Sequence, residues 1–149
     1  MFAKVMGEEA YFAYRIQLEI LLQIPTDASD QDIHRLIEAG FSASSVMALY
    51  ALGAIPPPQR DLIIPLKTLK SRLIQGQRLT TSESDRLFRY IHITAMAEVI
   101  FGNHTKAKHW LSKPKGSFLD NSPNEMLSTF QGTRLVEERL IQVAEGYAF

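Results

Sequence analysis

The chain has 149 residues, 46% of them hydrophobic and 21% charged, a composition that fits one compact domain or two small ones sharing a core and excludes a disordered chain. It has no cysteine, which excludes disulfides and thiol catalysis, and no apolar run reaches the roughly 18–20 residues of a membrane span. The formal net charge is zero, and the first residues lack a signal-peptide pattern, so we expect a folded cytoplasmic protein.

The first forty residues predict two helices. Residues 8–24 form an amphipathic helix that stops before Pro25, with apolar side chains at steps of three and four at Phe12, Ile16, Ile20 and Leu21. Ser29 and Asp32 have the spacing of a capping box and begin the second helix. Gly40 stands where a C-cap glycine belongs and ends it.

Prolines and glycines divide the middle of the chain into four predicted helices, over residues 42–53, 59–63, 66–75 and 80–101. The last of these begins at a capping box formed by Thr80 and Glu83 and ends before Gly102. Its second half is apolar nearly all round, which is typical of a helix at the centre of a domain or at an oligomer seam.

The C-terminal third predicts a short helix over residues 106–111, a strong helix start at residues 122–125 and a last helix over residues 131–145. The segments 76–80 and 113–122 are the expected loops. Because helix signals recur throughout and no strand signal stands out, the predicted fold class is all-α.

A search for catalytic chemistry finds no supporting motif. The four histidines, at positions 34, 92, 104 and 109, match no known metal-site spacing. The sequence also lacks a nucleophile elbow, a phosphate-binding glycine loop and a dinucleotide fingerprint. We therefore predict a binding protein with no enzymatic activity, no cofactor and no metal.

The charges are unevenly distributed along the chain. Residues 1–55 carry three basic and seven acidic side chains, residues 56–115 carry eleven and four, and residues 116–149 carry two and five. A basic central block is the electrostatic feature expected of a phosphate-contacting surface, although an ordinary solvated face has the same composition.

Residues 57–75 have the outline of a helix-turn-helix, with a short helix, a tight turn and a second helix. On the second helix, leucines gather on one side, while cations and small hydroxyls occupy the other, as a helix in the major groove of DNA requires. The predicted DNA-binding residues are Lys67, Thr68, Lys70, Ser71, Arg72 and Arg78. The alternative is a surface helix with solvated charges.

Several motifs occur in an order that resembles the Xre/MbcA/ParS antitoxin family. They are Pro65–Arg72, Leu79-Thr80, Glu83–Leu87, Ala97-Glu98, Phe101-Gly102, Ala107–Leu111 with Pro114, Ser122–Leu127, Gly132, Val136-Glu137, Leu140 and Gly146-Tyr147. The resemblance covers about residues 40–149 and is weakest over the first forty. It implies an N-terminal helical region over residues 1–40 that could serve dimerisation, an Xre-like helix-turn-helix region over 41–102, and a C-terminal toxin-binding domain over 103–149.

The resemblance also implies a function. The usual partner in this family is a RES-domain toxin that degrades NAD, so NAD would be the substrate of the partner and not a cofactor here. The antitoxin would block the toxin by direct binding and repress its own operon through operator DNA, as a homodimer within a toxin–antitoxin complex. The alternative is a stand-alone helix-turn-helix regulator without a toxin, and a neighbouring gene for a RES-type protein would discriminate between the two.

The C-terminal domain contains the predicted toxin contacts, which are Val136, Leu140, Val143, Gly146, Tyr147, Ala148 and Phe149. We expect the segment 146–149 to act as a plug for the toxin, because large aromatic side chains are favoured anchors in interfaces. Burial of these aromatics against Phe130 or the last helix is the alternative. Trp110, the only tryptophan, is expected to be a core anchor, with a toxin contact as the second interpretation.

Overall fold

The computed structural model describes residues 2–146, with side chains from Lys4 onward, and over this range the chain is all-α with no named β-strand. This confirms the predicted fold class. Its elements, in chain order, are η1 (Phe2–Met6), α1 (Glu8–Leu22), α2 (Asp30–Ala39), α3 (Ala43–Ala51), α4 (Pro57–Ile63), α5 (Leu66–Ile74), α6 (Thr81–Phe101), α7 (His104–Ser112), η2 (Gly116–Phe118), η3 (Asn124–Ser128) and α8 (Phe130–Ala144). None of these helices is both long and apolar enough to cross a membrane.

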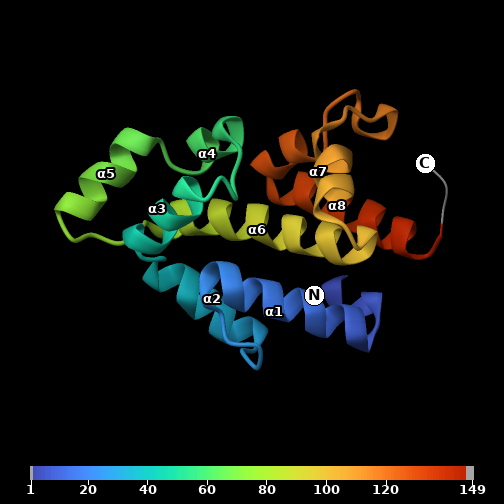
Figure 1. Ribbon diagram of the computed structural model, residues 1–149, viewed down its shortest axis with the longest axis horizontal. Helices are drawn as coiled ribbons and strands as arrows, with labels where there is room; N and C mark the ends of the chain where they lie inside the picture. The colour runs from blue at the N-terminus through green and yellow to red at the C-terminus, as the bar shows by residue number, and fades with distance from the viewer. Residues whose placement is uncertain (1, 147–149) are drawn as a thin grey trace.

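Helix α6 is the central element of the fold. It packs against α1 and α2 on one side and against α4, α7 and α8 on the other (Figure 1). Its second half is enclosed, with Ile91, Ile93, Ala95, Met96 and Ala97 all buried. The nearly uniform apolar character of this segment therefore reflects a helix surrounded by the others, as the sequence predicted.

Capping residues define the helix starts as the sequence predicted. Ser29 with Asp32 and Thr80 with Glu83 form complete capping boxes, in which each hydroxyl accepts a backbone N–H and each carboxylate accepts another. The hydrogen bonds from Ser29 hold the pKa of Asp32 below its usual value. Gly40 has a φ of 87°, and a Cβ there would lie 2.1 Å from the Leu79 carbonyl oxygen, so no other residue fits.

Helix α1 is apolar on two faces, and the buried face is not the predicted one. Tyr14, Leu18 and Leu22 point into the core, whereas most of the predicted apolar face is exposed. The exposed fractions are 60% for Phe12, 38% for Ile16 and 68% for Ile20, while Leu21 is partly buried. Periodicity detects both faces of such a helix but cannot decide which one meets the core.

A buried polar network joins three helices that are distant in sequence. The Tyr14 hydroxyl on α1 shares a hydrogen bond of 2.5 Å with His92 Nδ1 on α6. His92 Nε2 lies 3.5 Å from Glu137 Oε1 on α8. Burial raises the pKa of Tyr14 well above its usual value, so its hydroxyl stays protonated. The network therefore ties the N-terminal and C-terminal parts of the chain to the central helix.

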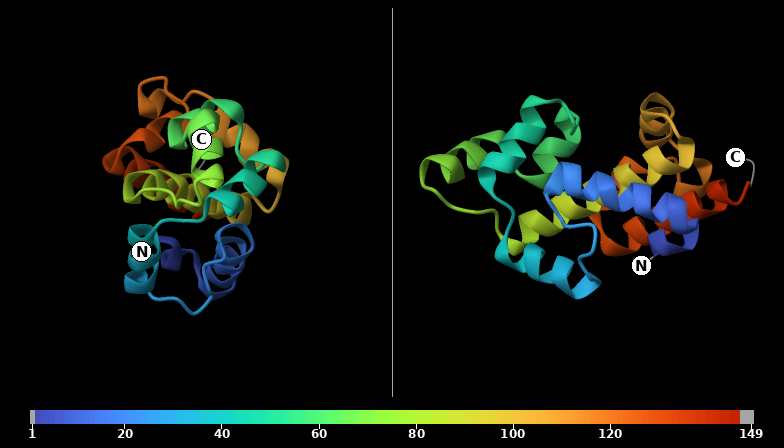
Figure 2. Two further views of the ribbon diagram at one scale, coloured as in Figure 1. Left: turned by 90° about the vertical axis from the view of Figure 1, so that its left-hand side faces the viewer. Right: turned by 60° about the horizontal axis from the view of Figure 1, so that its bottom comes forward.

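The molecule is elongated along α6, with α5 at one end and the C-terminal end of α8 at the other (Figures 1 and 2). The right-hand view of Figure 2 shows the same separation as Figure 1. A ligand on the outer side of α5 and another at the end of α8 can therefore bind without overlapping.

Candidate functional site

The helix-turn-helix consists of α4 and α5, joined at Ile64 and Pro65. Tyr50 on α3 fixes this turn, because its hydroxyl donates to the Arg60 and Ile64 carbonyl oxygens, each at 3.0 Å. Burial raises the pKa of Tyr50 to about 12, which keeps the donor protonated. Leu69 on the inner face of α5 is fully buried and anchors this helix to the core. The second helix is therefore held rigidly at the end of the molecule.

The outer face of α5 carries most of the predicted DNA contacts. Lys67, Lys70 and Ser71 are exposed, and Thr68 is half-buried beside them. Arg78 follows in the loop after α5, where its Nε donates to the Gly40 carbonyl oxygen at 2.7 Å. The two lysines and Ser71 are thus available to a partner, whereas the Arg78 guanidinium is partly engaged within the protein.

The helical wheel predicted that Arg72 is free to contact DNA on this face, but in the structure its guanidinium is paired with Glu83. Its Nη1 and Nη2 donate to the two carboxylate oxygens of Glu83 at 2.6 and 3.1 Å, and Nη1 also reaches the Arg78 carbonyl oxygen at 3.3 Å. Burial of Glu83 acts to raise its pKa, but hydrogen bonds from Thr80 and Arg72 outweigh this and lower the pKa overall. Arg72 therefore fastens α5 to the start of α6.

Two of the predicted toxin contacts on α8 belong to the core. Val136 and Leu140 are fully buried and face α6, so they are not available to a partner on this surface. Val143 is half-buried and Gly146 is exposed. The predicted contacts Tyr147, Ala148 and Phe149 lie outside the described residues. The amphipathic pattern of α8 thus marked its inner face, because the apolar side of a surface helix usually meets its own domain.

Three large apolar side chains that the sequence analysis did not select are exposed in the C-terminal third. They are Leu119 at 89%, Phe130 at 66% and Leu135 at 48%. Leu119 also adopts the left-handed conformation with φ 53°, which is uncommon for a bulky residue and concentrates at functional sites. Its loop is closed by a hydrogen bond from the Lys115 N–H to the Asn121 carbonyl oxygen. No periodic pattern could have found a loop-tip leucine.

Trp110 is a core residue, as the primary interpretation held. It is buried, and its ring centroid lies 5.8 Å from that of Phe101 on α6. The Lys115 ammonium lies 5.2 Å above the indole ring, a cation–π distance. Burial lowers the pKa of Lys115, with further lowering from Arg139 and Lys113. Trp110 therefore anchors α7 and the following loop to the central helix.

Close packing in the C-terminal third also depends on Gly132 in α8. A Cβ at this position would lie 1.9 Å from the Met126 carbonyl oxygen of η3. Only glycine lets η3 lie this close against α8. The preceding Ser122 and Glu125 cap each other reciprocally, with backbone-to-side-chain distances of 2.9 and 3.2 Å, and these bonds hold the pKa of Glu125 below its usual value. The strong helix start predicted at residue 122 is thus the beginning of a 3-10 helix.

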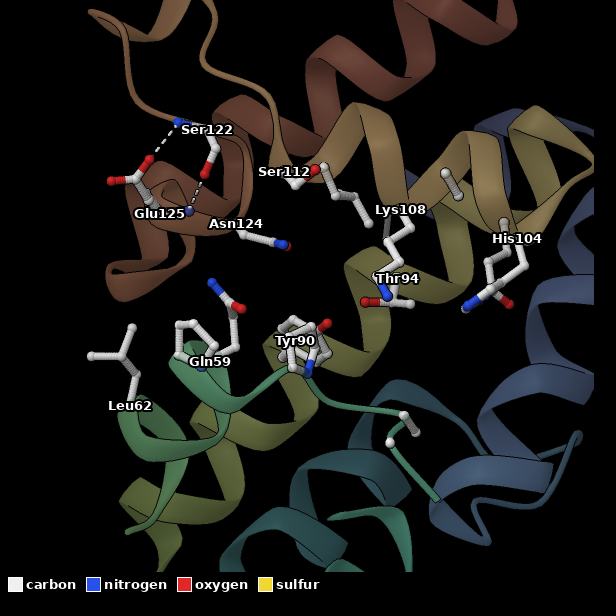
Figure 3. Close-up of a pocket in the computed structure, with 17 residues that line it drawn as sticks. Gln59, Leu62, Tyr90, Thr94, His104, Lys108, Ser112, Ser122, Asn124 and Glu125 are labelled. Carbon is white, nitrogen blue, oxygen red and sulfur yellow. Dashed lines mark hydrogen bonds and ion pairs between the residues drawn. The ribbon is translucent and has the colours of Figure 1, made fainter. Parts of the chain in front are cut away.

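A cleft of about 500 Å³ separates α4 from the C-terminal third (Figure 3). Helix α6 contributes Tyr90 and Thr94, α7 contributes Lys108 and Ser112, and the segment at η3 contributes residues 122, 124 and 125. Burial raises the pKa of Tyr90 to about 12, so its hydroxyl stays protonated. Among the described residues, no cluster of three or more His, Cys, Asp or Glu side chains could hold a metal ion.

Comparison with the sequences of known proteins identifies the family of this chain. Residues 96–146 match the sequence model of the Antitoxin Xre/MbcA/ParS C-terminal toxin-binding domain. A protein of Pseudomonas putida named Antitoxin Xre is 54% identical over 147 residues, which are 99% of this chain and 92% of the relative. The chain belongs to the Xre/MbcA/ParS antitoxin family. Another Antitoxin Xre, from Yersinia enterocolitica, is 30% identical over 99 residues, covering 64% of this antitoxin and 67% of the relative.

The matched region corresponds to a definite part of this antitoxin. It begins at Met96 within α6 and includes α7, η2, η3 and α8. The exposed Leu119, Phe130 and Leu135 all lie within it, and so do the anchors Trp110 and Gly132. The helix-turn-helix lies outside the match. The predicted division into residues 1–40, 41–102 and 103–149 stays a prediction, and α6, which lies in the second region, packs against helices of the other two.

Proposed function

We propose that this antitoxin neutralises a RES-type, NAD-degrading toxin by direct binding and represses its own operon in the cytoplasm by binding operator DNA. The observation that carries the proposal is the match of residues 96–146 to a toxin-binding domain, together with a relative named Antitoxin Xre that is similar over nearly the whole chain. NAD is then the substrate of the toxin, and the antitoxin itself performs no chemistry.

The toxin contact is formed by the exposed apolar residues of the C-terminal domain. We assign this contact to Leu119, Phe130 and Leu135. The predicted contacts Val136 and Leu140 are buried in the fold and cannot reach a partner. Exposed apolar residues are common on any protein, so the support for this contact is that these three lie within the matched toxin-binding domain. The half-buried Val143 and the exposed Gly146 offer further contacts at the end of α8.

The segment 147–149 serves as the plug in this proposal. Its two aromatic side chains would enter the toxin and cover the cleft that receives NAD. A variant that lacks Tyr147, Ala148 and Phe149 should keep its fold and operator affinity but release NAD degradation in an assay with purified RES toxin. Full inhibition by the truncated protein at equal concentration would contradict the role of residues 147–149 as a plug. Inhibition would then have to come from Leu119, Phe130 and Leu135.

Operator binding is assigned to the outer face of α5. Lys67 and Lys70 are exposed cations that would contact phosphates or guanine, and Ser71 and Thr68 offer hydroxyls to bases or backbone. Arg78 lies nearby for a phosphate contact. The separation of α5 from the end of α8 supports one molecule that holds DNA and toxin at the same time (Figure 2).

The homodimer is assigned to the exposed stripe of α1, defined by Phe12, Ile16 and Ile20. These residues lie at steps of four, so an antiparallel pair of α1 helices places Ile16 against its own copy and Phe12 against Ile20 of the partner subunit. Such a stripe is self-complementary, as a twofold interface requires. Helix-turn-helix proteins usually bind paired half-sites as dimers, which favours a second copy of this chain as the occupant.

A further inference from the structure

We infer that the cleft between α4, α6, α7 and η3 is a second docking site for the toxin, which receives a short segment carrying one apolar side chain and one hydrogen-bond donor. The inference rests on the proposed function, because it takes the toxin as the occupant. It adds a contact that is separate from the end of α8 and that includes a wall from the helix-turn-helix.

The inference rests first on the side-chain carboxamide of Asn124, whose buried oxygen has no hydrogen-bond partner among the described residues. The side chain points into the cleft (Figure 3), and the residue is only 9% exposed. Its Oδ1 is buried and has no hydrogen-bond partner anywhere in residues 2–146. A buried amide oxygen without a partner costs free energy, which a bound donor recovers. Rotation of the amide would present either its carbonyl oxygen or its NH₂ group to the occupant.

The remaining surface of the cleft combines apolar walls and neutral polar groups with the charged side chains of Glu98, Lys108 and Glu125. Leu62 on α4 is 64% exposed at its edge, and Leu111 lines the opposite side from α7. Gln59 projects from α4 toward the cleft from the side opposite Asn124 (Figure 3). Two carboxamides with apolar walls suit a peptide segment, whose backbone offers both donors and acceptors and whose side chain fills the apolar space.

The toxin is the occupant favoured by the position of the walls. The contributions from α7 and η3, and Glu98 on α6, all fall within the matched toxin-binding domain, so the cleft continues that domain. The fourth wall is α4, the first helix of the helix-turn-helix. A toxin segment in the cleft therefore contacts both functional parts of the antitoxin at once.

Two kinds of variant test this inference in the full-length antitoxin with purified RES toxin. Asn124→Ala removes the carboxamide without removing any hydrogen bond of the free protein, so the thermal midpoint should stay unchanged or rise while toxin affinity falls at least tenfold in calorimetry. A residue with a merely structural role would lose stability instead. Gln59→Trp should fill the cleft from α4 and weaken toxin binding similarly, whereas Gln77→Trp, an exposed control outside the cleft, should not.

The possible results separate this inference from the proposed function. If the parent antitoxin does not bind the toxin, the proposed function fails and the inference fails with it. If the parent binds the toxin and both cleft variants bind it within twofold of the parent, only the inference is overturned. Should Gln59→Trp not fold, the affinity and thermal midpoint of Asn124→Ala decide alone.

Discussion

Replacement of Arg72 by alanine should destabilise the antitoxin, although the helical wheel placed this side chain on a DNA-facing surface. The bidentate pair with Glu83 joins the second helix of the helix-turn-helix to the first turn of α6. The two side chains are only 19% and 11% exposed, so water does not compete freely for either partner. Arg72→Ala removes both hydrogen bonds and leaves the Glu83 carboxylate with its cap to the Thr80 N–H alone.

The structure sets the expected size of this loss. Hydrogen bonds to charged groups contribute about 1.5–3 kcal/mol each, and breaking a buried pair costs about 3–5 kcal/mol. Residual exposure of Arg72 and the remaining cap on Glu83 place the expected loss at the lower end, at about 2–3 kcal/mol. For a chain of this length, that corresponds to a fall in the thermal midpoint of roughly 5–10 °C.

Urea denaturation followed by circular dichroism measures this loss, with Arg35→Ala as the matched control. Arg35 pairs with Asp32 at 4.0 Å, but both side chains are more than half exposed, so no measurable loss of stability is expected. A loss for Arg72→Ala no larger than that of the control would refute the structural role of the pair.

The folded-state pKa of Glu83 is lowered, so its stabilisation is present above the unfolded pKa, 4.5, and is lost as the pH falls through the folded value. Arg72→Ala should therefore reduce the pH dependence of stability in this acidic range.

Three further predictions concern the operator, the dimer and the core. Lys67→Glu with Lys70→Glu should abolish operator binding in fluorescence anisotropy with helix content unchanged, because both side chains are exposed; unaltered binding at moderate salt would contradict the α5 assignment. Ile16→Glu should convert a dimer into a monomer in light scattering, whereas Ile74→Glu on α5, at a side chain that is 87% exposed against 38% for Ile16, should not; a dimer that survives Ile16→Glu would rule out the α1 stripe. Trp110→Ala should lower the free energy of unfolding by roughly 3–5 kcal/mol; parent-like melting with lost toxin binding would make Trp110 an interface residue instead.

Helix boundaries were predictable because they depend on local chemistry. Ser29, Thr80 and their paired carboxylates cap the helices at the predicted positions, and Gly40 and Gly102 end α2 and α6 as expected. Each of these signals involves residues within a few positions of one another, so it is contained in the sequence itself. The central burial of α6 was predictable for a related reason, since a helix without a polar side must be surrounded.

The orientation of the helix faces was harder to predict because it depends on contacts between distant segments. Both faces of α1 are apolar, and only the packing on α6 shows that Tyr14 is buried while Phe12 is exposed. Val136 has the pattern of an interface residue and of a core residue alike. The ion pair of Arg72 joins residues eleven positions apart in different helices, which no helical wheel represents. The cleft at Asn124 likewise forms from four separate segments.

The central claim is that this antitoxin binds its toxin through the C-terminal domain, and hydrogen–deuterium exchange with and without a purified RES toxin tests it most directly. We expect the toxin to slow exchange in α7, the 113–122 loop and α8, with α5 unchanged because it lies at the other end of the molecule (Figure 1). Protection confined to α5, or equal exchange throughout the chain with the toxin present, would contradict it.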